Sequence, residues 1–321
     1  MTLVRLQNPT FSRRLCQVSM SMCLVTVTAL SLSACSSDTP SSKSARPKVE
    51  QAIGAPVDTP RITVLDYGNA PQQLVTYHDD GVQTNRRIKI SDGLTQHTES
   101  AAQLDPTAPK GGDVTTLTVD AALSAARDDS QRSATAVISN PDIDDLEHAH
   151  DIASADGFQL GWFGADNGRI SSVNLAAPVD ASDNGRALME RFLMKMVNIP
   201  IIFPEEPIGP SARWTVDSRV TGEATMLQTT TFTLKSLKGN DVELDVAISQ
   251  RPALGAIEAQ GTTLQVLNAN TTSTGNLRLN LSQPLPAQGA LRYTTRVIYG
   301  ERDKDVRVVQ DSTTSVEFST P

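Results

Sequence analysis

Residues 230–249, "TTFTLKSLKGNDVELDVAIS", decide the fold class of this chain. Apolar and polar side chains alternate around Phe232 and Leu234, and they alternate again from Val242 to Ile248. The "KGND" segment between them has the residues that a tight turn favours. Because successive residues of a strand point to opposite faces, each of these strands has one apolar face. The stretch therefore predicts an antiparallel hairpin with one buried face.

The same alternation recurs along most of the chain beyond residue 61. It is found in "RITVLD" (61–66), "RIKIS" (87–91), "ARWTVDSRV" (212–220), "NLRLNLS" (276–282), "LRYTTRVIY" (291–299) and "DVRVVQDSTTSVEF" (305–318). A further hairpin is predicted in "FQLGWFGADNGRISSVNL" (158–175), with its turn at 166–168. We expect a mainly β (α+β) protein whose strands form a curved antiparallel sheet or an open half-barrel.

One segment, 183–198, has helical periodicity instead. Its apolar residues fall on one side of a helix, and the sequence identifies them as a candidate wall for an apolar ligand: Leu188, Met189, Phe192, Leu193 and Met196. Ser182 or Asp183 provides an N-cap, and Pro200 ends the helix. Since strands precede and follow this helix, two related lobes, 61–200 and 201–321, remain an alternative to one body.

The N-terminus is typical of an export signal. Residues 1–14 contain three arginines and no acid, and the apolar run "CLVTVTALSLSA" follows at 23–34. Small residues close this run just before Cys35. We expect residues 1–34 to be a signal peptide and residues 35–60, rich in Ser, Pro and Ala, to be a flexible tether. The body then spans 61–321.

The signal ends in Leu32-Ser33-Ala34-Cys35, which resembles the lipobox of bacterial lipoproteins. The resemblance implies that the Cys35 thiol accepts a lipid and that a peptidase cuts before Cys35. An ordinary signal peptide or an uncleaved membrane anchor is the alternative reading. All three readings place the body outside the membrane that the signal enters, because the arginines stay inside. The predicted location is extracytoplasmic, with the membrane as a partner through the lipid.

A second stretch, "FPEEPIGPSARWTVDS" (203–218), resembles an element of uncharacterised lipoproteins from actinobacteria. The shared pattern falls on Pro204, Glu206, Pro207, Ile208, Gly209, Ala212 and Trp214. At the level of fold alone, strands curved around a helix are also similar to half-barrel lipoproteins that carry lipids across bacterial envelopes. Neither resemblance implies a catalytic residue.

Composition argues against several classes of function. The net charge is −8, so a basic nucleic-acid interface is not expected. The three cysteines, Cys16, Cys23 and Cys35, leave no disulfide within a chain that starts at Cys35. The sequence has neither a Gly-x-Ser-x-Gly elbow nor a phosphate loop. We expect no enzyme activity and no cofactor.

The run "DIDDLEHAHD" (142–151) offers weak metal ligands in His148, His150, Asp144 and Glu147. If it were a strand, the two histidines would share a face. A solvated acidic loop is the commoner outcome, so no metal site is predicted. The leading hypothesis is a tethered lipoprotein that binds a lipid or other apolar ligand. The alternatives are a structural or protein-interaction module of the envelope with a filled core and, more weakly, metal binding by 142–151.

Overall fold

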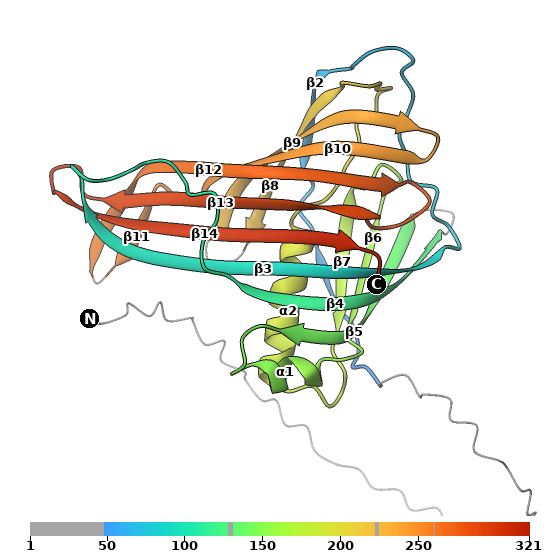
Figure 1. Cartoon of the computed structure of the whole chain (residues 1–321), viewed down its shortest axis with the longest axis horizontal. Helices are drawn as coiled ribbons and strands as arrows, with labels where there is room; N and C mark the ends of the chain where they lie inside the picture. The colour runs from blue at the N-terminus through green and yellow to red at the C-terminus, as the bar shows by residue number, and fades with distance from the viewer. Residues whose placement is uncertain (1–47, 128–130, 222–224, 260) are drawn as a thin grey trace, which may run out of the picture. The chain divides into compact units, whose positions relative to one another are not determined.

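The alternating segments form one curved antiparallel sheet. The computed structural model describes residues 48–127, 131–221, 225–259 and 261–321, and these ranges contain fourteen strands and two helices (Figure 1). The strands are β1 (Ile53–Pro56), β2 (Arg61–Asp66), β3 (Gln83–Ser100), β4 (Thr115–Arg127), β5 (Arg132–Ile143), β6 (Gln159–Gly164), β7 (Ile170–Ala176), β8 (Arg213–Thr221), β9 (Thr225–Lys238), β10 (Asp241–Pro252), β11 (Ala256–Ala259), β12 (Thr262–Asn280), β13 (Gln288–Gly300) and β14 (Val306–Ser319). The helices are α1 (Ala149–Ser154) and α2 (Asp183–Val197). The expected mainly β fold with an open, curved sheet is confirmed.

The sheet is continuous from one edge to the other. Its strand order is β1-β7-β6-β5-β4-β3-β14-β13-β12-β10-β9-β8-β2, and β11 pairs with β12. The last strand, β14, pairs with β3 from Val306 opposite Ser100 to Ser319 opposite Arg87. The two lobes considered from the sequence therefore share a full-length ladder and belong to one sheet.

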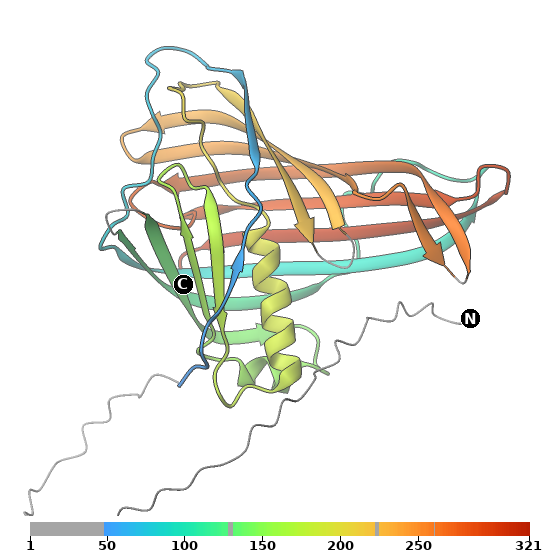
Figure 2. The same cartoon turned by 180° about the vertical axis from the view of Figure 1, so that it is seen from behind.

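Helix α2 lies against the concave face of this sheet (Figures 1 and 2). Met189, Phe192 and Leu193 are fully buried there and belong to the same core as the inward side chains of the strands. Ser182 is the N-cap, because its Oγ accepts a hydrogen bond from the Gly185 amide at 3.0 Å. The helix ends at Val197, one residue before the predicted end.

The two edges of the sheet are joined by a short piece of chain, residues 53–66, which we call the strap. Its first strand, β1, pairs with β7, and its second, β2, pairs with β8 at the opposite edge. The residues between them pass over the C-terminal half of α2 (Figure 2), where Val57 and Pro60 line a small cavity with Met194.

The strap and the residues just before it correct the expected boundary between tether and body. Val49 forms a bridge with Pro178, and Glu50 makes a 2.6 Å ion pair with Arg186 of α2. Residues 48–60 are thus part of the folded body rather than of a free tether. The sequence gives no alternation here because all four residues of β1 are exposed and the strand depends on pairing alone. Residues 35–47 lie outside the described ranges.

The packing of α2 predicts a large effect of truncation. Leu193→Ala should lower the free energy of unfolding by about 2–5 kcal/mol, because Leu193 is fully buried and the change leaves a cavity. Leu146→Ala is the matched control, since Leu146 is 88% exposed, and it should cost less than about 0.5 kcal/mol. Urea unfolding of the two variants measures both values. Equal effects would contradict the position of α2 in the core.

Candidate functional site

A small apolar cavity lies between the C-terminal end of α2 and the concave face of the sheet. Its volume is about 70 Å³. Two proline-containing loops, 199–201 and 284–286, complete its wall. The lining residues are mostly apolar and come from six strands, α2 and the loops: Tyr77, Arg132, Leu160, Trp162, Gly168, Ile170, Met196, Val197, Ile199, Pro200, Ile201, Leu277, Pro284, Leu285, Pro286, Leu291, Val316 and Phe318.

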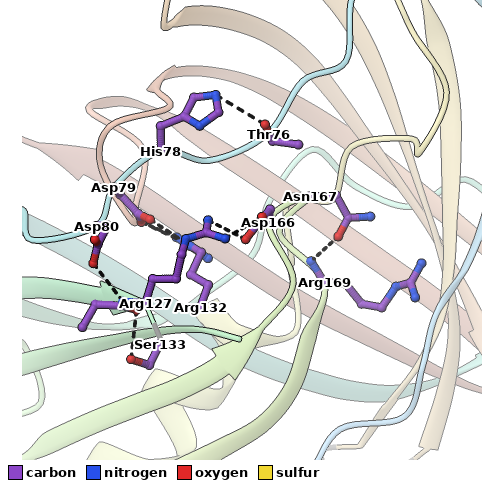
Figure 3. A network of polar contacts seen from close by, with 11 residues as sticks. Thr76, His78, Asp79, Asp80, Arg127, Arg132, Ser133, Asp166, Asn167 and Arg169 are labelled. Atoms are coloured by element: carbon purple, nitrogen blue, oxygen red, sulfur yellow. Dashed lines mark hydrogen bonds and ion pairs between the residues drawn. The ribbon is translucent and has the colours of Figure 1, made fainter. Parts of the chain in front are cut away.

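One charged side chain, Arg132 at the start of β5, reaches this apolar wall. Arg132 is 4% exposed and pairs with Asp79, which is 2% exposed. Its Nε donates to the Asp79 Oδ1 at 2.8 Å, and its Nη2 donates to Oδ2 at 2.5 Å (Figure 3). Such a bidentate pair offsets part of the cost of burying both charges. It leaves Nη1 outside the pair.

Asp79 lies in residues 75–82, an irregular stretch that we call the crossing segment and that holds the carboxylate in place. Backbone hydrogen bonds join this segment to three separate elements: Tyr77 donates to the Asp166 carbonyl, His78 to the Leu281 carbonyl, and Gly81 to the Ala125 carbonyl. The segment turns back at Gly81, where φ is 71°. These contacts fix the carboxylate opposite Arg132 without a regular strand.

Tyr77 covers the guanidinium of Arg132 from the same segment. The guanidinium carbon lies 4.3 Å from the centre of the Tyr77 ring, within the range of a cation–π contact. Tyr77 also begins a row of buried aromatic rings that continues through Phe203, Trp214 and Phe232, with 5.4–6.0 Å between neighbouring centroids. Burial raises the pKa of Tyr77 to about 12. Its hydroxyl therefore remains protonated at neutral pH.

A second ion pair lies beside the buried one but is open to solvent. Arg127 on β4 contacts Asp166, in the turn between β6 and β7, at 2.6 Å, and both side chains are about 40% exposed (Figure 3). The hydrogen bond from Arg127 to Asp166 is the main reason that the pKa of Arg127 is raised. Asp80 accepts from the Arg127 amide at 2.9 Å. The buried pair lines the cavity through Arg132, whereas this outer pair does not reach it.

The turn that carries Asp166 also sets the width of the cavity. Gly168 has a φ of 93°, and a Cβ there would lie 2.2 Å from the Ile201 carbonyl oxygen and 3.0 Å from a ring carbon of Tyr77. Only glycine lets the 199–201 loop and Tyr77 approach the turn so closely. Asn167 accepts the Phe203 amide at 2.8 Å through its backbone oxygen, which ties the same turn to the loop.

The proposed ligand wall on α2 is mostly core. Leu188, Met189, Phe192 and Leu193 pack against the sheet, and none of these four lines the cavity beneath the end of the helix. Met196 alone of the five does so, since it lies in the last turn of α2. The predicted lipidation site Cys35 and the predicted cleavage motif Leu32, Ser33 and Ala34 fall outside the described residues.

The acidic histidine run has a structural role. Asp142 and Ile143 end β5, but the histidines lie at the start of helix α1, so His148 and His150 do not share the face of a strand. His148 bonds to Asp145 at 2.9 Å, and Asp144 accepts the Thr116 amide at 2.8 Å. Among the described residues, no group of three or more His, Cys, Asp or Glu side chains could hold a metal ion.

Helix α1 is joined to α2 through Asp151. The Asp151 carboxylate accepts the hydroxyl of Ser182 at 2.7 Å and the amide of Asn184 at 3.3 Å. The bond from Ser182 is the main reason that the pKa of Asp151 lies below its usual value. This part of the run therefore fixes the start of α2.

The 203–218 stretch is also a packing element. Trp214 is fully buried and donates its Nε1 hydrogen to the Ile202 carbonyl at 2.8 Å. Ile208 forms a bridge with Gln73, just before the crossing segment. A Cβ on Gly209 would lie 1.9 Å from the Asn69 carbonyl oxygen. The motif thus positions the segment that continues to Tyr77 and Asp79.

Sequence reasoning missed Arg132, Asp79 and Tyr77. A signal for Arg132 does exist, because Arg132, Ala134, Ala136 and Ile138 alternate in phase and all four are buried. A charge in phase with an apolar face indicates a buried partner. Asp79 has no comparable signal, since it lies in an irregular segment 53 residues away.

The comparisons with known proteins leave the function open. A family of unknown function (DUF6263) matches residues 188–286, which cover most of α2, strands β8 to β12 and the 284–286 loop. The match does not include Tyr77, Asp79 or Arg132. No curated protein matches the chain. Within the described ranges, neither helix is long and apolar enough to cross a bilayer.

The buried pair predicts an asymmetric response to mutation. Asp79→Ala should cost about 3–5 kcal/mol of unfolding free energy, because it leaves the Arg132 charge buried without a partner. Asp166→Ala removes a carboxylate from the neighbouring exposed pair and should cost no more than about 1 kcal/mol. Urea unfolding at neutral pH compares the two. Similar costs would show that the Asp79 pair is solvated.

Proposed function

We propose that the protein is a membrane-anchored, extracytoplasmic lipoprotein without enzyme activity, and that its half-barrel binds an apolar ligand. The observation that carries the binding proposal is the apolar cavity at the end of α2. Ligand sites are typically concave and mainly apolar, with few polar groups. This cavity has that composition, with Arg132 and Tyr77 as its polar side chains.

The size of the cavity limits what fits without movement. At about 70 Å³ it is smaller than the roughly 300–1,000 Å³ of most small-molecule sites. It has room for a short aliphatic segment, and a longer chain requires the 284–286 loop or the end of α2 to move outward. Leu285 is only partly buried and lies in that loop, so it is placed where a chain would enter.

The second candidate is a structural or protein-interaction module. The fully buried Met189, Phe192 and Leu193 favour it, because they fill the space between α2 and the sheet. In that case the 70 Å³ cavity is a packing defect of the core. The two candidates differ in whether the cavity takes up an apolar molecule.

The anchor is tested at Cys35. Mass spectrometry of the protein extracted from membranes should find Cys35 as the first residue, carrying a diacylglyceryl group. Cys35→Ser should move the protein from the membrane fraction to the soluble extracytoplasmic fraction or leave the signal uncleaved. A wild-type N-terminus at another residue, or an unmodified Cys35, would overturn the lipoprotein proposal.

Binding is tested by blocking the mouth of the cavity. Leu285→Trp adds bulk to the 284–286 loop and should abolish uptake of a decyl-chain probe, measured by native mass spectrometry on the full chain carrying Cys35→Ser. Leu254→Trp is the matched control, since Leu254 is 73% exposed in a loop away from the cavity, and it should bind like the parent. No uptake by the parent chain would favour the interaction module.

A further inference from the structure

The geometry points to a ligand whose polar end is an uncharged carbonyl oxygen, as in an acyl ester. This oxygen accepts a hydrogen bond from Nη1 of Arg132. This inference rests on the proposed apolar ligand and specifies its chemistry. It starts from the one charged side chain in the cavity wall, which is 96% buried and yet lines the cavity. A buried charged group facing an apolar space normally has a task that a core residue does not.

The hydrogen bonds of Arg132 indicate which atom is offered to a ligand. Asp79 takes Nε and Nη2 of the guanidinium. Asp79 is not among the residues that line the cavity, so the wall contains Arg132 without its carboxylate partner. Nη1, which has two further hydrogens to donate, is the remaining end of the guanidinium fork.

The charge of the pair selects between acceptors. Asp79 already neutralises Arg132, so a ligand carboxylate would place a second negative charge in the same buried region with no additional cation. The neighbouring cation, Arg127, is held by Asp166 and does not line the cavity. Burying an unpaired carboxylate is far more costly than burying a carbonyl that accepts a hydrogen bond. A neutral carbonyl therefore fits, and a fatty-acid anion does not.

The position of Tyr77 also favours a ligand with one polar end near Arg132. Its ring lies over the guanidinium and also lines the cavity, so it confines Arg132 to one orientation. The rest of the cavity wall consists of aliphatic and aromatic side chains such as Leu160, Leu277 and Phe318. One end of the cavity is thus suited to a carbonyl, and the rest is suited to methylene groups.

The inference is tested with three probes of equal chain length: methyl decanoate, decane and decanoate, at about pH 8, where the acid is ionised. Binding to the full chain carrying Cys35→Ser is measured by displacement of a fluorescent apolar probe. Methyl decanoate should bind about tenfold more tightly than decane, the gain expected from one charge-assisted hydrogen bond. Decanoate should bind more weakly than the ester.

A double variant, Asp79→Val with Arg132→Met, removes both charges together and keeps the summed side-chain volume similar, a change that buried pairs commonly tolerate. It should bind decane like the parent but lose the preference for the ester. Arg127→Gln, in the exposed pair, should keep the preference.

The outcomes separate the two proposals. If none of the three probes binds the parent chain, the proposed apolar ligand is wrong. If decane binds as tightly as the ester, or decanoate binds at least as tightly, the cavity is a ligand site but the carbonyl inference is overturned. That comparison uses the parent chain alone, so it stands even where the double variant fails to fold. Retention of the ester preference by a folded double variant would also overturn the role of Arg132.

Discussion

Burial of the concave face of the sheet is the constraint on which the rest of this structure depends. The strands contribute buried apolar side chains to the concave face, and the curved sheet turns this face toward helix α2. Phe192 and Leu193 of α2 fill the space that the curvature creates. One helix does not fill it to the end, because α2 stops at Val197 and only the 199–201 loop continues the wall beyond it. The cavity lies at this point, so it follows from the length of the helix.

The polar contacts around the cavity serve to hold irregular chain against the sheet. The crossing segment 75–82 belongs to no strand, and it is fixed by a few backbone hydrogen bonds to three elements and by the Asp79–Arg132 pair. The aromatic row from Tyr77 to Phe232 links this segment to the first strands after α2. Arg132 of the ion pair contacts Tyr77 of the aromatic row, and both residues line the cavity.

The strands and α2 could be predicted because their periodicities are local. Alternation at Val242–Ile248 or 291–299 predicts a strand whatever its neighbours are, and the 183–198 pattern gave the helix to within one residue. In the strap, β2 could be predicted from its alternation, but β1 could not be, since its exposed residues carry no pattern and form a strand only by pairing with a distant edge. Only one residue of the ion pair could have been predicted from the sequence. Arg132 is in phase with a buried face, whereas the position of Asp79 depends on contacts from three parts of the chain.

The strap also has a consequence for the order in which the protein folds. Arg61 of β2 and its partner Asp217 of β8 are 156 residues apart in the sequence. During synthesis the strap emerges early, yet the strands with which it pairs, β7 and β8, come much later. In the same way, β3 can pair with β14 only after the end of the chain has been made. Pairings of such high contact order form slowly. We expect the chain to remain without its completed sheet until its last strand has emerged, so the ordering of β1, β2 and β3 depends on chain made much later.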